Sequence, residues 1–67
     1  MTKRQVEEVK QIIREYAIVV AVGIKLFDLT LEESKMRYAS ELRRVRLGLT
    51  EEQYQTIEKG ILSLSWR

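Results

Sequence analysis

The sequence predicts an all-α protein: a three-helix domain with a long central N-terminal helix, which pairs with a second copy as a helical homodimer. Three observations predict this fold class. The 67 residues contain no proline and only three glycines, so little opposes helix formation. A Ser/Thr-x-x-Glu/Gln capping box occurs three times, at Thr2, Thr30 and Thr50. Each box precedes apolar residues at three- and four-residue steps, as expected of a helix with one buried face. Residues 1–67 are treated as one domain, at a size where the core of one chain is marginal.

The first helix is expected from about Lys3 to Lys25, starting at the box of Thr2 and Gln5. One apolar stripe defines its predicted buried face, made of Val6, Val9, Ile13, Tyr16, Val20, Ile24 and Phe27. From Tyr16 to Ile24 the other faces are apolar as well. Because a helix that is apolar on most sides needs neighbours all round, this part should lie at the centre of a core or an interface.

A strand over residues 16–27 is the alternative to the second half of this helix. Five of the nine residues from Tyr16 to Ile24 are β-branched, and Gly23 costs a helix interior about 1 kcal/mol relative to alanine. No second segment of the chain favours a strand, so such a strand needs a partner chain for pairing. Helix is the preferred prediction, and an intermolecular strand stays open.

The second and third helices follow the other two boxes. The second is expected from about Leu31 to Leu47, with acidic residues in its first turn, basic residues in its last, and a left-handed cap at Gly48. The third is expected from about Glu51 to Leu64, and Trp66 is expected to hold the C-terminus against the body. Their buried stripes are Leu31, Tyr38, Leu42, Val45 and Leu49, and Tyr54, Ile57, Ile61 and Leu64.

No catalytic, cofactor-binding or metal-binding residue is predicted, so a non-enzymatic protein is expected. The chain has no cysteine and no histidine, which removes disulfides, thiolate and imidazole ligands, and a histidine base for the serines. The acidic pairs are adjacent in sequence, so on a helix their side chains point about 100° apart. The longest charge-free run, Tyr16 to Ile24, is nine residues, whereas crossing a bilayer needs about 20. A cytoplasmic protein without a membrane partner is expected.

The best candidate for nucleic-acid contact is a basic cluster in the second helix. It consists of Lys35, Arg43, Arg44 and Arg46. Lys35, Arg43 and Arg46 share one side of the helix, where they can neutralise phosphates. Basic residues in a last helical turn also stabilise the helix dipole, and Glu41 interrupts the cluster. We therefore favour a role in capping the helix.

Two DNA-binding families offer partial matches to the sequence. The thirteen residues Leu42–Tyr54, LRRVRLGLTEEQY, resemble the opening of a repressor-type helix-turn-helix domain, without the recognition helix that follows in that family. The order of segments also resembles a ribbon-helix-helix protein, with Val20–Leu26 as the strand and Gly48-Leu49-Thr50 as the turn. That family reads bases with polar side chains of its strand, and the corresponding face here has one polar residue among five. Either resemblance implies a DNA-binding regulator.

The preferred functional prediction is a small interaction or regulatory module that self-associates and binds another protein. The predicted oligomer interface comprises Tyr16, Ala17, Val19, Val20, Val22 and Ile24. Ala17 and Ala21 are four residues apart, with Gly23 nearby, so a second backbone can approach closely there. A symmetric dimer covers the excess apolar surface of the first helix most simply.

Overall fold

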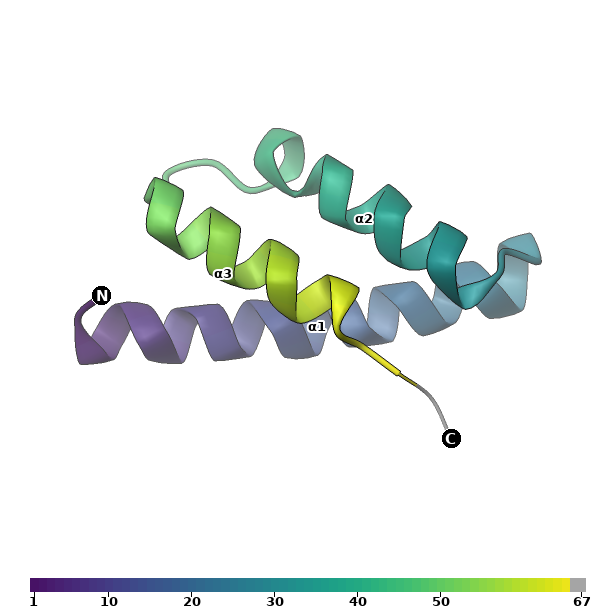
Figure 1. The fold of residues 1–67 in the computed structure, drawn as a ribbon, viewed down its shortest axis with the longest axis horizontal. Coiled ribbons are helices and arrows are strands. Elements are labelled where there is room, and N and C mark those ends of the chain that lie inside the picture. Colours follow the sequence, from purple (N-terminus) through teal and green to yellow (C-terminus); the bar gives the residue numbers. More distant parts are fainter. Residues whose placement is uncertain (66–67) are drawn as a thin grey trace.

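The computed structural model describes residues 1–65 and contains three packed helices (Figure 1). Helix α1 spans Lys3–Phe27, α2 spans Leu31–Val45 and α3 spans Glu51–Leu62. The 25 residues of α1 account for the longest dimension of the molecule, 37 Å, because a helix rises about 1.5 Å per residue. Helix α2 returns antiparallel to α1, and α3 then runs back beside both. Within residues 1–65 there is no strand, so the intermolecular-strand alternative is wrong for residues 16–27.

All three predicted capping boxes form, and each sets the first residue of a helix. The Thr2, Thr30 and Thr50 hydroxyls accept hydrogen bonds from the backbone N–H three residues later, at 3.1–3.2 Å. The side chains of Gln5, Glu33 and Gln53 accept the threonine N–H in return, at 2.8–3.0 Å. The helix starts were therefore predictable to the residue, because these contacts are local.

The core lies where α2 and α3 meet one side of α1. Its buried apolar members are Val9, Ile12, Tyr16, Val20, Ala39, Leu42, Ile57 and Ile61. Ile13 and Ile24 pack against this core while remaining partly exposed. Ile12, which the predicted stripe omitted, is fully buried. Phe27 and Val45, which the stripes included, are mostly exposed because each ends its helix beyond the contact with its neighbours.

Two helical glycines allow close contacts between helices. A Cβ on Gly23 would lie 2.7 Å from the Ser34 hydroxyl and 3.1 Å from the Tyr38 ring, so α1 and α2 touch here. Ser34 is fully buried, and its hydroxyl donates a 2.9 Å hydrogen bond to the Val20 carbonyl. Gly60 of α3 meets the end of the Ile13 side chain in the same way. Gly23 therefore lies against α2 of the same chain, and Ala17 and Ala21, where a second backbone was predicted to approach, take no part in this contact.

The ends of the helices differ from the predictions more than their starts. Helix α1 continues two residues beyond Lys25 to Phe27, and its C-cap Asp28 adopts a left-handed conformation without being glycine. Helix α2 stops at Val45 with an extended Arg46 as its cap. Gly48 has the predicted positive φ, 85°, but it lies in the loop and does not cap the helix. The predicted contact of Trp66 lies outside the described residues.

Candidate interaction surface

The side of α1 that faces away from α2 and α3 is apolar over its second half. We call this surface the outward face and define it by Ala17, Ile18, Ala21, Val22, Lys25 and Leu26. Ile18 and Leu26 are 67% and 71% exposed, which is unusual for large aliphatic side chains on the same side of one helix. The outward face is therefore not covered by the chain's own helices.

A shallow hollow lies along the outward face. It has a volume of about 320 Å³ and is lined by Ala17, Ile18, Ala21, Val22 and Lys25. Ala17 and Ala21 are the smallest of these lining residues. Small residues at a four-residue spacing let the backbone of another helix come close, so the shape suits an elongated apolar partner.

The outward side of α1 changes from polar to apolar at Ala17. Helical periodicity places Arg4, Glu7, Gln11 and Arg14 in line with Ile18, and all four are exposed. The first half of α1 is thus an ordinary amphipathic helix, with its polar side in solvent. The apolar outward surface is confined to roughly three turns between Ala17 and Leu26.

The predicted oligomer-interface residues separate into two groups. Tyr16 and Val20 are buried in the chain's own core, and Ile24 packs against that core. Ala17 is half-buried, while Val19 and Val22 are exposed. Ile18 and Leu26, which the prediction left out, are the most exposed large residues of this part of α1. An amphipathic helix can be oriented from its sequence, but a segment that is apolar all round does not indicate which side faces outward.

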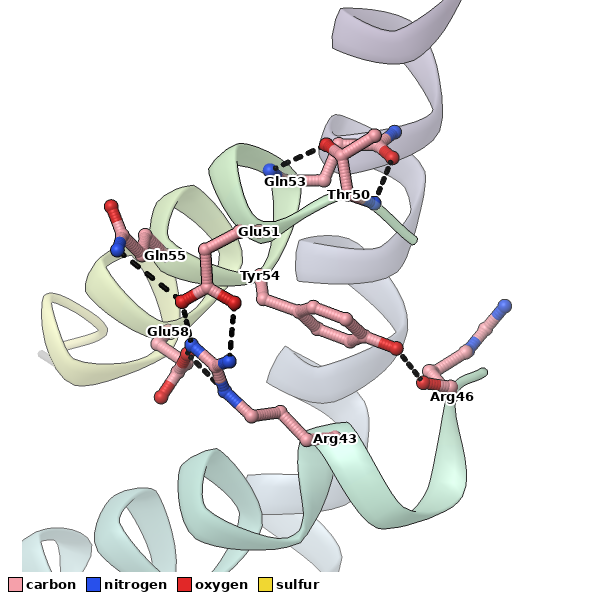
Figure 2. A network of polar contacts seen from close by, with 8 residues as sticks. All are labelled: Arg43, Arg46, Thr50, Glu51, Gln53, Tyr54, Gln55 and Glu58. Atoms are coloured by element: carbon pink, nitrogen blue, oxygen red, sulfur yellow. Dashed lines mark hydrogen bonds and ion pairs between the residues drawn. The ribbon is translucent and has the colours of Figure 1, made fainter. Parts of the chain in front are cut away.

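The basic cluster does not form a free cationic stripe, because carboxylates pair with its members. The guanidinium of Arg43 donates to both carboxylate oxygens of Glu51, at 2.6 and 2.8 Å, and to Glu58 at 2.9 and 3.2 Å (Figure 2). It also lies 5.1 Å from the centre of the Tyr54 ring. Arg44 pairs with Glu41 one turn earlier, at 3.5 Å. Arg43 therefore joins α2 to α3.

The other two cations of the cluster also form intramolecular contacts. Arg46 pairs with Glu15 of α1. The carbonyl of Arg46 accepts the hydroxyl of Tyr54 (Figure 2). Lys35 is buried, and its ammonium group donates to the Leu64 carbonyl at 3.1 Å while lying 3.1 Å from Glu32. These contacts hold the end of α2 and the residues after α3 in place. Their sequence separations, up to 31 residues, explain why spacing did not predict them.

The shifted pKa values follow from these same contacts. The hydrogen bonds from Arg43 lower the pKa of Glu51 below its ordinary value, and the contact with Glu51 raises the pKa of Arg43. The Thr30 N–H lowers the pKa of Glu33 in the second capping box. Burial raises the pKa of Tyr16. None of these groups lies in the hollow of the outward face, so the shifts belong to the scaffold.

Among residues 1–65, no group of three acidic, histidine or cysteine side chains is placed to hold a metal ion. Over the same residues, none of the helices combines the length and the apolar character needed to span a bilayer. Comparison of the chain with known proteins found no matching family, no related curated protein and no similar solved structure.

Proposed function

We propose that this protein is a non-enzymatic interaction module that self-associates through the outward face of α1. The observation that carries the proposal is the exposure of large aliphatic side chains on three successive turns of one helix. Monomeric proteins rarely leave such a continuous apolar surface in water, and patches of a few hundred Å² commonly mark binding sites. A second copy brings the same face and buries both at once.

The size of the outward face sets the expected strength of the dimer. A few hundred Å² from each copy gives an interface of roughly 1,000 Å² in total, near the lower limit for specific association. Such interfaces are weak, so we expect dissociation constants in about the micromolar range. Self-association should therefore depend on concentration, and a stronger protein partner can compete with it for the same face.

DNA binding is the other function that the sequence suggested, and no observation favours it over self-association. The guanidinium of Arg43 is held by Glu51 and Glu58, and that of Arg46 by Glu15. To contact phosphates these arginines would first have to leave their carboxylates, which lowers any gain in affinity. Arg44 is the most exposed guanidinium of the cluster, and one surface arginine is a small electrostatic footprint.

Sedimentation equilibrium of the wild type and two matched variants tests the proposal. Ile18→Asp places a charge on the outward face. Met36→Asp makes the same kind of change on the exposed side of α2, at a position with nearly the same exposure, 65% against 67%. We expect the wild type and Met36→Asp to dimerise as the protein concentration rises through the micromolar range, and Ile18→Asp to stay monomeric.

Circular dichroism provides the folding control, because both substitutions are at exposed positions and should leave the helix content unchanged. A wild type that remains monomeric to hundreds of micromolar contradicts the proposal. A dimer that Met36→Asp disrupts and Ile18→Asp leaves intact contradicts it as well, because the contact would then involve α2.

A further inference from the structure

The outward face of α1 has charged surfaces of opposite sign at its two ends. On the N-terminal side, over residues 3–14, the four exposed bases Lys3, Arg4, Lys10 and Arg14 outnumber the two exposed acids, Glu7 and Glu8, and Glu7 pairs with Lys10 at 3.7 Å. On the other side, the corner between α1 and α2 has the exposed acids Asp28, Glu32 and Glu33, of which Glu32 pairs with Lys35 at 3.1 Å. Lys25 lies between this corner and the apolar turns. The surface around the docking face is therefore electrically polarised along the axis of α1.

We infer that the second copy docks antiparallel, with the two α1 helices crossing at Ala21. The inference rests on the proposed function and adds the orientation of the partner. In a parallel pair each residue faces its own counterpart, so Arg14 meets Arg14 and Lys25 meets Lys25. An antiparallel pair instead brings the basic half of one helix to the acidic corner of the other. Opposite charges favour the second arrangement and steer the encounter.

The spacing of the charged residues fits a crossing at Ala21. Arg14 precedes Ala21 by seven residues, and Asp28 follows Ala21 by seven residues. At about 1.5 Å per residue, both lie about 10 Å from the crossing point along the helix axis. In the antiparallel dimer each Arg14 therefore lies level with Asp28 of the other copy, and symmetry forms the pair twice.

The sizes of the residues in the hollow fit the same crossing. Ala17 lies four residues before Ala21 and Lys25 lies four residues after it. An antiparallel crossing places the long aliphatic stem of Lys25 over the small Ala17 of the other copy, so a large side chain meets a small one. The ammonium group can then extend into solvent beyond the seam. Ala21 lies at the centre, where the two backbones come closest.

Single cysteines test the orientation directly, because the natural chain has none. In the antiparallel dimer, two copies of Ala21→Cys meet at the symmetry axis and form a disulfide in a glutathione redox buffer. Two copies of Ala17→Cys lie about 12 Å apart along the axis. Two copies of Lys25→Cys are equally far apart, and a disulfide tolerates only about 7 Å between Cα atoms. Neither of these two variants should therefore cross-link with itself.

Mixing the Ala17→Cys and Lys25→Cys proteins should produce a cross-linked heterodimer, which mass spectrometry identifies if one of them is isotopically labelled. Efficient self-cross-linking of both Ala17→Cys and Lys25→Cys indicates a parallel pair and overturns the inference, while self-association itself survives. A wild type that sediments as a monomer overturns the proposed function together with the inference. The two failures are therefore distinguishable.

A charge substitution provides an independent test of the same orientation. Arg14→Gln removes both symmetry-related pairs with Asp28. The association constant of the dimer should therefore fall by between about two-fold and thirty-fold at low salt. Arg4→Gln removes the same charge from the same side of α1, but about 25 Å from the crossing, and should leave the constant nearly unchanged. Equal effects of the two substitutions, or none from Arg14→Gln, count against an antiparallel crossing at Ala21.

Discussion

Arg43 of α2 and Glu51 of α3 form a two-bond ion pair, in which both carboxylate oxygens accept from one guanidinium group, at 2.6 and 2.8 Å. The same guanidinium contacts Glu58, which lies about two turns after Glu51 on the same face of α3. Geometry of this kind is specific to arginine, because the planar guanidinium offers parallel N–H groups, whereas lysine offers a single ammonium.

Replacing Arg43 should therefore lower thermal stability even when the positive charge is kept. We expect the melting temperature of Arg43→Lys to lie below that of the wild type, and that of Arg43→Gln to be lower still. Arg44→Lys is the matched control, since Arg44 has one weak contact at 3.5 Å. Calorimetry measures the melting temperatures of these three variants beside that of the wild type. An unchanged melting temperature for Arg43→Lys means that the two-bond geometry contributes nothing to stability.

The lowered pKa of Glu51 makes part of the stability dependent on pH. Its folded pKa lies below the ordinary value of 4.5, so the carboxylate stabilises the fold above pH 4.5. This stabilisation is lost as the pH falls through the folded pKa, where the group becomes protonated in both states. The melting temperature should fall on acidification below pH 4.5, and Glu51→Gln should reduce that fall. Identical profiles for the two proteins contradict the assignment.

The two helical glycines should respond differently to alanine. Alanine favours a helix interior by up to about 1 kcal/mol over glycine. At Gly23 the new methyl meets the buried Ser34 hydroxyl at 2.7 Å, so we expect a net loss of about 1–3 kcal/mol from overpacking. At Gly60 it meets the rotatable end of Ile13, so Gly60→Ala should be neutral or slightly stabilising. Urea denaturation of both variants checks the contrast. Stabilisation at both positions would show that helix propensity outweighs packing, and equal destabilisation would show that Ile13 cannot yield to the new methyl.

Truncating the fully buried Leu42 should test the core where the three helices meet. Leu42→Ala is expected to cost about 2–5 kcal/mol, a large share of the stability available to a chain of this size. Leu47→Ala is the control, because Leu47 is 82% exposed. Chemical denaturation should show a partly or wholly unfolded Leu42→Ala protein beside an unchanged Leu47→Ala protein.

Duplex DNA should bind weakly and without sequence preference, because the arginines of α2 are held by carboxylates. We expect dissociation constants no tighter than about 10⁻⁴–10⁻⁶ M near physiological salt in fluorescence anisotropy. Arg44→Gln is the informative variant, since replacing Arg43 or Arg46 also removes contacts between helices. Tight binding that Arg44→Gln abolishes would contradict self-association as the principal role of the chain.

The sequence was sufficient for the helix starts and for most of the core, because both depend on local patterns. Thr2, Thr30 and Thr50 each form their box within four residues, so no tertiary information was needed. The stripe of Ile57 and Ile61 belongs to a strongly amphipathic helix and was predicted directly. The end of α2 was not predicted, because Arg46 is held extended by contacts with Glu15 and Tyr54, which lie on other helices.

The outward face was predicted only in part, because its membership depends on the rotation of α1 about its own axis. The predicted stripe placed Tyr16 and Val20 correctly on the buried face. Because residues 16–24 are apolar on every side, however, both were also assigned to the oligomer interface, and the exposed Ile18 was left out of it. The position of α2, brought close by Gly23 and Ser34, determines that rotation. The carboxylates opposite the basic cluster were missed for the same reason, since they come from other helices.

The threonine boxes also bear on how quickly the chain reaches its folded state. Each capping box forms within one helical turn. The three helices can therefore start at their correct first residues before they pack against one another. Chains dominated by short-range contacts of this kind fold in about microseconds to milliseconds. Dimerisation requires diffusion and at micromolar concentrations is slower than folding. Each molecule should therefore be folded before it meets a second copy.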